Sequence, residues 1–159
     1  MNVIVAADEA WGIGKGGDQL CYISEDLKRF QRLTTGHPVL LGRKTLATFP
    51  GGRPLKNRRN LILSTQMTEA PAGAEVFSTL EDALAAAPED TFVIGGESVY
   101  RAALDRCDTA YVTRIHRTFE ADRFFPDLDA DPSWQAEATE GPFTQGDLAY
   151  EYVTYRRKG

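Results

Sequence analysis

The chain has 159 residues, of which 42% are hydrophobic and 26% are charged, and its formal net charge is −5 at pH 7. These values predict one soluble globular domain over residues 1–159, and no apolar run approaches the ~20 residues that a membrane-spanning helix needs. The negative charge argues against nucleic acid as a partner, because proteins that bind it need basic surfaces to neutralise phosphates.

Alternating strand and helix patterns fill the first two-thirds of the chain. The pattern of residues 3–7 predicts a strand with no basic segment ahead of it, so we expect no export signal and a cytoplasmic protein. Residues 8–21 contain four glycines and predict a long mobile loop, a kind of segment that often carries function. A helix is expected over 24–35, capped by Ser24 and stopped by Gly36.

The pattern continues with short buried strands and further helices. Strands are predicted at 39–41, 61–63, 75–77 and 92–94, and helices from 43 to a stop at Pro50, over 80–87 and over 97–104. After Asp108, residues 109–116, 133–139 and 150–156 alternate with polar residues, which favours antiparallel strands. The sequence therefore predicts an α/β fold with a mixed, largely parallel sheet and helices on both faces.

The cysteines and histidines predict no metal centre. Cys21 and Cys107 lack CxxC spacing and a clustered histidine, so we expect neither a zinc site nor a disulfide framework. His37 precedes a proline in a turn and His116 lies in a strand-like run, and neither is assigned a function.

Two predicted strands end in glycine and lead directly into a helix. One junction is 92–100, which contains Gly95-Gly96, and the other is Gly42-Arg43-Lys44-Thr45. Glycine lets a ligand approach the main chain, and free N–H groups at a helix start favour an anion. Together with the hydroxyls of Ser64-Thr65 after a third strand, the junctions suggest a dinucleotide site. Tight turns in which glycine only relieves crowding remain the alternative.

Asp26 is the carboxylate of greatest interest. In helix 24–35 it borders an apolar stripe that includes Leu27 and Phe30. Burial would raise its pKa, and hydrogen bonds or a cation would lower it. The residues alone favour the simpler role of an acid that complements the positive end of the helix. The basic run 53–59 leaves a similar choice between a carboxylate clamp and a solvated loop.

Taken in chain order, these segments resemble the dihydrofolate reductase family from Val3 to Arg156. The matching motifs are Gly12-Ile13-Gly14, Glu25-Asp26-Leu27-Lys28-Arg29-Phe30, Leu41-Gly42-Arg43-Lys44-Thr45, Arg53-Pro54-Leu55-Lys56-Asn57-Arg58, Asn60-Leu61-Ile62-Leu63-Ser64, Val93-Ile94-Gly95-Gly96, Tyr111-Val112-Thr113 and Phe124-Phe125-Pro126-Asp127. The resemblance implies a three-layer fold with a mixed eight-stranded sheet. It implies NADPH-dependent reduction of 7,8-dihydrofolate to 5,6,7,8-tetrahydrofolate for one-carbon and thymidylate metabolism, by a monomeric antifolate target whose partners are small molecules.

The resemblance gives Asp26 a catalytic meaning. It matches the acid that hydrogen-bonds N3 and the 2-amino group of the pterin, with Thr113 as its partner, and that favours protonation of N5 by solvent while hydride reaches C6. The implied substrate contacts are Val5, Ala6, Leu27, Phe30, Leu55 and Ile94, with Arg58 as the clamp for the glutamate carboxylate. The implied cofactor contacts are Ala6, Ile13, Gly14, Gln19, Gly42, Arg43, Lys44, Thr45, Leu63, Ser64, Thr65, Ile94, Gly95, Gly96, Glu97, Ser98, Val99 and Tyr100. Residues 8–23 match a mobile lid, Gly95-Gly96 matches a pair joined by a cis peptide bond, and Glu97 is expected to point away from phosphate.

Several positions depart from the family pattern: Leu20-Cys21 in place of Pro-Trp, Ser24 in place of a frequent proline, and Ser98 in place of a basic residue. Tyr22 is expected to act as a catalytic substitute for the missing Trp if the loop shifts. NADPH preference then depends on Arg43 and Thr65, and use of NADH stays open.

Two alternatives to the leading interpretation remain. A related reductase of another pterin or of a riboflavin-pathway pyrimidine would share the nucleotide junctions, and replacing Arg58 distinguishes it. A non-catalytic binder of folate or nucleotide is suggested by the missing Trp, and Asp26→Asn distinguishes it.

Overall fold

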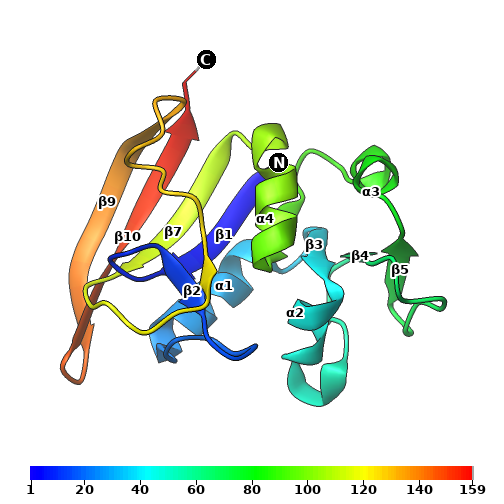
Figure 1. Cartoon of the computed structure of the whole chain (residues 1–159), viewed down its shortest axis with the longest axis horizontal. Coiled ribbons are helices and arrows are strands. Elements are labelled where there is room, and N and C mark those ends of the chain that lie inside the picture. The colour runs from blue at the N-terminus through cyan, green and yellow to red at the C-terminus, as the bar shows by residue number, and fades with distance from the viewer. Residues whose placement is uncertain (159) are drawn as a thin grey trace.

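The computed structural model describes residues 1–158, and its largest element is an eight-stranded sheet in the order β5-β4-β3-β6-β1-β7-β10-β9 (Figure 1). Its strands are β1 (Asn2–Ala7), β3 (Val39–Gly42), β4 (Asn60–Leu63), β5 (Ala74–Phe77), β6 (Phe92–Gly95), β7 (Thr109–Ile115), β9 (Trp134–Gln145) and β10 (Leu148–Arg157). A two-stranded sheet joins β2 (Gly12–Gly14) to β8 (Arg123–Phe124). The helices are α1 (Ser24–Thr34), α2 (Arg43–Ala47), α3 (Leu80–Ala86) and α4 (Glu97–Ala103), with 3₁₀ turns η1 (Pro50–Gly52) and η2 (Leu104–Arg106).

The large sheet is mixed, as the sequence predicts. β1 pairs in parallel with β6 and β7, and β3 pairs in parallel with β4 and β6. β10 runs antiparallel to both β7 and β9. All four residues of β3 and of β6 are buried, because parallel strands in the centre of such a sheet are covered on both faces.

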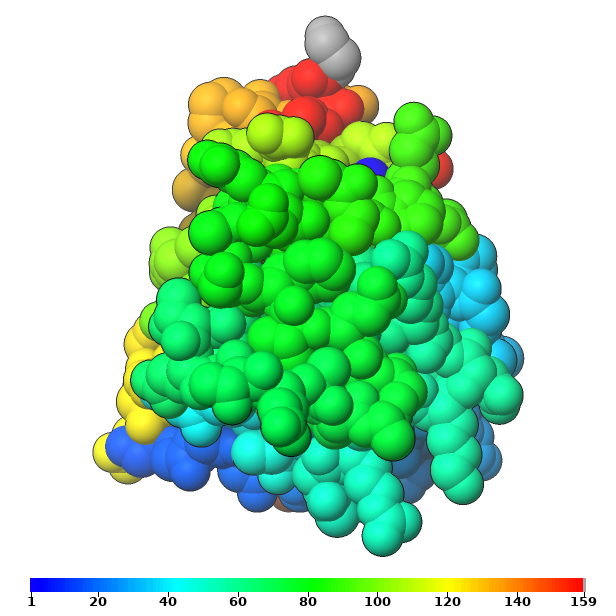
Figure 2. All heavy atoms as spheres, turned by 90° about the vertical axis from the view of Figure 1, so that its right-hand side faces the viewer, coloured from blue at the N-terminus to red at the C-terminus, as the bar shows by residue number. Residues whose placement is uncertain are grey.

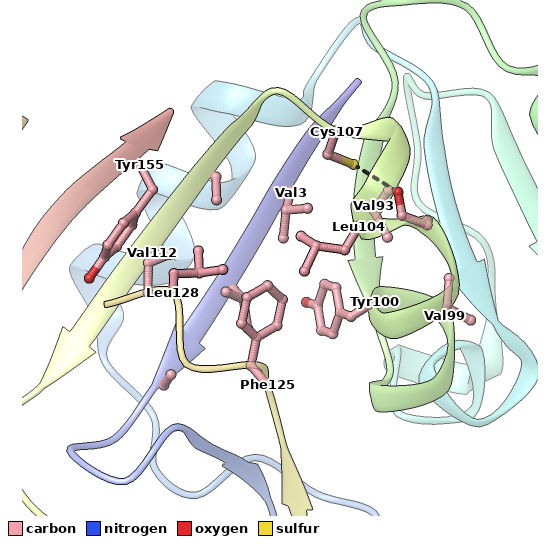
Figure 3. Packing of buried hydrophobic residues seen from close by; sticks show 14 of the residues in the cluster. Val3, Val93, Val99, Tyr100, Leu104, Cys107, Val112, Phe125, Leu128 and Tyr155 are labelled. Carbon is pink, nitrogen blue, oxygen red and sulfur yellow. Dashed lines mark hydrogen bonds between the residues drawn. The ribbon is translucent and has the colours of Figure 1, made fainter. Parts of the chain in front are cut away.

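Side chains of β1 alternate between the two faces of the sheet. Val3 and Val5 pack in a core cluster with Tyr100 of α4, whereas Ile4 packs in a second cluster with Phe30 of α1. Figure 1 shows α4 in front of the sheet and α1 behind it, and Figure 3 shows Val3 and Tyr100 within the first cluster. The predicted placement of helices on both faces is confirmed.

The β5 end of the sheet is covered by α3. Ala83 of this helix has no exposed surface and packs in the same cluster as Val3. Seen towards this end, the green part of the chain, which includes β5 and α3, forms most of the surface (Figure 2). In the part of the chain that the structure describes, no helix is long and apolar enough to cross a membrane.

The two ends of α1 differ in how well the sequence predicts them. Ile23 is the N-cap residue and no side chain caps the helix, so the predicted Ser24 cap is wrong. The Ser24 N–H instead donates a hydrogen bond to Gln145 Oε1 at 2.8 Å. At the other end the prediction is confirmed, because Gly36 takes a φ of +85° just beyond the helix.

The segment predicted as a loop over 8–21 contains short paired structure. β2 lies within it and pairs with β8, and Lys15 bridges to Asp18. Strands of two or three residues are too short to leave a periodic pattern in the sequence. β9 also continues beyond its predicted end at residue 139 as far as Gln145, because β10 pairs with it along this length.

Candidate active site

The two predicted strand-to-helix junctions lie side by side where the parallel strands β3 and β6 end. A Cβ built on Gly95 would lie 3.2 Å from Thr45 Oγ1, and one built on Gly42 would lie 3.1 Å from Val99 Cγ2. Gly95 has a φ of +130° and is joined to Gly96 by a cis peptide bond. Larger residues at these positions would crowd the space between the junctions, so glycine does more here than shape one turn.

The side chain of Glu97 is directed away from this junction, whereas that of Tyr100 lies against it, because a Cβ built on Gly95 would lie 3.5 Å from the Tyr100 hydroxyl oxygen. Among the described residues, none provides a side-chain cap for α2 or α4. Glu97 Oε2 accepts a hydrogen bond from the Phe124 N–H at 2.6 Å, so its carboxylate faces β8. This confirms that Glu97 points away and removes its side chain from the predicted cofactor contacts. Tyr100 is 5% exposed, and its hydroxyl donates to the Ile4 carbonyl at 2.8 Å.

Asp26 and Thr113 form a direct pair between α1 and β7. Thr113 Oγ1 donates a hydrogen bond to Asp26 Oδ1, and Thr113 is only 2% exposed. Burial raises the pKa of Asp26, while the Thr113 hydrogen bond and the positive charge of Arg29 oppose that shift. A bond to a buried strand residue goes beyond the helix-end role that the residues alone favoured for Asp26.

The apolar residues implied as substrate contacts divide between the two faces of the sheet. Three of them lie in the cluster between α1 and the sheet: Phe30, Leu55 and Ile94. Ala6 is the register partner of Thr113, so it shares that face. The side chain of Val5 belongs to the opposite cluster, so only its backbone can make the contact implied for this residue. Leu27 is 60% exposed on α1.

Arg58 is fixed against α1. Its Nη1 donates to Gln31 Oε1 at 2.7 Å and to Thr34 Oγ1 at 3.0 Å, and its Nε donates to the Lys56 carbonyl at 2.8 Å. Desolvation by burial lowers the pKa of Arg58 from its usual value. The structure therefore holds one guanidinium of the basic run 53–59 in a defined orientation.

The segment 8–23 is attached to the loop before β8. The buried carboxylate of Asp8 accepts hydrogen bonds at 2.8–2.9 Å from three backbone N–H groups, those of Ala10, Gly12 and Phe119. The Gly16 N–H donates to Asp122 Oδ2 at 3.0 Å. Of the lid residues implied to contact the cofactor, Gly14 is buried, Ile13 is half-buried and Gln19 is exposed.

Tyr22 and Cys21 occupy different environments. The Tyr22 side chain is 67% exposed, and its hydroxyl donates to Asp18 Oδ1 at 2.8 Å. Among the described contacts none joins this hydroxyl to Asp26, so the catalytic role of Tyr22, expected only if the loop shifts, stays a prediction. Cys21 packs against a buried cluster that contains Tyr152, and burial raises the pKa of its thiol.

The turn after β4 holds Ser64 and Thr65, the residues implied for the adenosine end of the cofactor. Ser64 Oγ accepts hydrogen bonds from the N–H groups of Gln66 at 3.1 Å and Met67 at 3.2 Å, which closes the turn after Leu63. Thr65 is exposed, and so are three residues implied for the pyrophosphate: Arg43 and Lys44 on α2 and Ser98 on α4.

Comparison with known proteins gives one consistent result. A family model described as Dihydrofolate reductase matches residues 1–157. The chain belongs to the dihydrofolate reductase family. It is 35% identical to the dihydrofolate reductase of Bacillus subtilis over 162 residues, which cover 99% of this chain and 95% of the relative. It is 39% identical to that of Mycobacterium tuberculosis over 149 residues, which cover 91% of this chain and 90% of the relative. A solved structure of dihydrofolate reductase from Enterococcus faecalis, complexed with NADP(H) and RAB-propyl, matches with a TM-score of 0.87 and 35% identity, over 99% of this chain and 96% of that chain.

Sequence reasoning missed two residues that fix the segment 8–23 and the start of α1. Gln145 accepts from the Ser24 N–H and donates to the Tyr22 carbonyl at 2.7 Å, so it holds both sides of Ile23. No local signal marks Gln145, because its partners are more than 120 residues away. Asp8 has a recognisable signal, since Asp directly after a strand often accepts bonds from backbone N–H groups nearby.

Proposed function

We propose that this chain reduces 7,8-dihydrofolate to 5,6,7,8-tetrahydrofolate with NADPH, by hydride transfer to C6 and protonation at N5. The observation that carries the proposal is the hydrogen bond between Thr113 and Asp26 in a chain of this family. The pterin presents N3–H and its 2-amino group as adjacent donors, and a carboxylate is the acceptor that satisfies both.

Asp26 acts in its ionised form as the anchor of the pterin. Thr113 donates to Oδ1 of this carboxylate and fixes its orientation, so that the remaining acceptor sites face the substrate. The negative charge favours a proton on N5, which is delivered by solvent. In a half-buried site this charge acts more strongly than it would in water.

The cofactor site is built from the two glycine junctions. NADPH, when bound, supplies the hydride that reaches C6. The close approach of Gly95 to Thr45 leaves room for a ligand only where no Cβ is present, and this supports a nucleotide lying against the main chain. Arg43 and Lys44 are exposed at the start of α2, where they attract the phosphates.

The remaining contacts assign the rest of the substrate. Phe30, Leu55 and Ile94 form the apolar wall. Arg58 takes the carboxylate of the glutamate tail through Nη2, whose two N–H groups are left over by its bonds to Lys56, Gln31 and Thr34. We expect the protein to be a monomer, and size-exclusion chromatography tests this expectation. We also expect it to lie in the cytoplasm, to have small molecules as its only partners, and to supply one-carbon and thymidylate metabolism.

The test is a turnover assay with purified protein, dihydrofolate and NADPH, followed by the loss of nicotinamide absorbance. Dependence on dihydrofolate supports the proposal, and its absence refutes it. Asp26→Asn removes the anchor, and Glu25→Gln is the matched control because this exposed neighbour pairs only with Lys28 in the described contacts. A parallel series with NADH measures the cofactor preference that Ser98 leaves open.

A further inference from the structure

Arg29 is a cation placed beside the Asp26 and Thr113 pair. It lies three residues after Asp26 on α1, so the two side chains share one side of the helix. Its guanidinium carbon lies 4.1 Å from the centroid of the Tyr152 ring and 6.0 Å from that of Tyr111. Both rings come from strands of the sheet that α1 covers, so Arg29 is directed at the sheet.

The sheet register explains why Tyr152 brings Arg29 to this place. Tyr152 of β10 is the direct antiparallel partner of Thr113 on β7, and such partners have neighbouring side chains on one face. The residue that bonds Asp26 and the ring that supports Arg29 are therefore adjacent. A guanidinium above an aromatic face is attracted by the ring electrons, more strongly as water is removed. Tyr152 is 8% exposed, so this support is largely dry.

We propose that Arg29, held on Tyr152, is a positioning residue that keeps the Asp26 carboxylate ionised in its half-buried site. The proposal rests on the function proposed above, because Asp26 acts there as an anion. Burial favours the neutral acid. The Thr113 hydrogen bond opposes this effect most, and Arg29 adds the nearby positive charge that opposes it further.

The other charged and titratable groups around Asp26 either disfavour its negative charge or act on it only through Arg29. Cys21 on the lid, Tyr100 on α4 and Tyr152 on β10 each have a raised pKa to which the charge of Asp26 contributes, so all three lie within its field. The pKa of Tyr152 is raised to about 12, chiefly by burial, so its ring stays neutral beneath Arg29 at neutral pH. Glu140 on β9, the register partner of Tyr152, acts on Arg29.

The direct test is a carboxyl carbon-13 NMR titration of Asp26 in the free, full-length protein. The Asp26 signal is assigned by its loss in Asp26→Asn. In Arg29→Gln the titration midpoint is expected to move to higher pH, because the carboxylate loses its cation. Arg29→Lys retains the charge and is expected to move the midpoint less. Lys28→Gln removes the same charge from the adjacent residue, which is solvent-exposed and paired with Glu25, and should leave the midpoint unchanged.

Turnover gives a second readout. In Arg29→Gln, the acid limb of the pH profile of kcat with dihydrofolate is expected to move to higher pH. Below the midpoint kcat should be several-fold lower than in the wild type, and well above the midpoint it should equal the wild-type kcat. An unchanged Asp26 midpoint in Arg29→Gln, or an equal shift in Lys28→Gln, overturns the proposal. Because the NMR titration needs no substrate, its outcome is independent of whether the protein reduces dihydrofolate.

Discussion

Asp26→Asn separates what the negative charge of Asp26 contributes to turnover from what the shape of its side chain contributes. The amide oxygen of Asn can still accept the Thr113 hydrogen bond, so the local geometry is retained. The variant loses two charge-assisted bonds to the pterin, each worth about 1.5–3 kcal/mol. A loss of about 3–6 kcal/mol corresponds to a fall in kcat/KM of about 10²- to 10⁴-fold.

The assay is steady-state turnover of dihydrofolate with NADPH across pH. In the variant, protonation of N5 depends on solvent alone, so its residual activity should rise as the pH falls. Glu25→Gln should stay within about twofold of wild type, because it lies outside the proposed contacts and only surface charge changes. A loss of less than tenfold at pH 7, or a variant whose activity does not rise in acid, would refute the role assigned to Asp26.

The same substitution should make the folded protein more stable at neutral pH. Burial raises the pKa of Asp26 in the folded state above the ordinary value of 3.8. The folded protein therefore binds this proton more tightly than the unfolded chain does, and stability falls as pH rises from the unfolded value through the folded one. Asn removes this loss, so urea unfolding at pH 7 should show a higher free energy of unfolding for the variant. The difference should vanish below pH 3.8, where the acid is protonated in both states.

Three further predictions concern the contacts around the site. Arg58→Gln should raise KM for dihydrofolate about tenfold or more with a smaller change in kcat, because a charged contact is lost from binding; an unchanged KM would favour a reductase of another substrate. Gln145→Ala should speed hydrogen exchange of the Ser24 N–H about fivefold, as expected for the loss of about 1 kcal/mol of hydrogen bonding, and equal protection would contradict the contact. Asp8→Ala should lower the free energy of unfolding in urea by about 2–4 kcal/mol, because three N–H groups lose their acceptor, whereas exposed Glu9→Ala should change it by less than about 1 kcal/mol.

Most of the large sheet could be predicted because its strands and helices leave local signals. Residues 39–41 and 92–94 form short apolar runs between glycine and proline signals, and both became central strands. The lid could not be predicted in the same way. β2 depends on pairing with β8, and Gln145 depends on a hairpin that meets the start of α1, so neither contact is encoded in neighbouring residues.

The site shows the same division between local and long-range information. The glycine junctions are local features, and the sequence placed both at strand ends. The pairing of Asp26 with Thr113 spans 87 residues, and only the family resemblance indicated it. Arg29 was part of a matching motif, but its role depends on Tyr152, which no motif includes. The residues that set the charge state of an acid are thus the least accessible to sequence reasoning, because distance in space decides them.

The effect of having Cys21 where the family usually has Trp can also be argued from the environment of this residue. Cys21 packs beside a cluster that already contains the rings of Tyr150 and Tyr152, with Phe119 against it, so apolar contact at this position does not depend on a large side chain there. A thiol is only a weak hydrogen-bond donor, and burial together with the negative charge of Asp26 raises its pKa, so it stays neutral. Replacing an indole N–H by this thiol therefore alters hydrogen bonding near the pterin and leaves Asp26 attached to Thr113. We therefore expect the Cys21 departure to change the rate of the proposed reduction more than the reaction class, which the proposal assigns to the Asp26 and Thr113 pair.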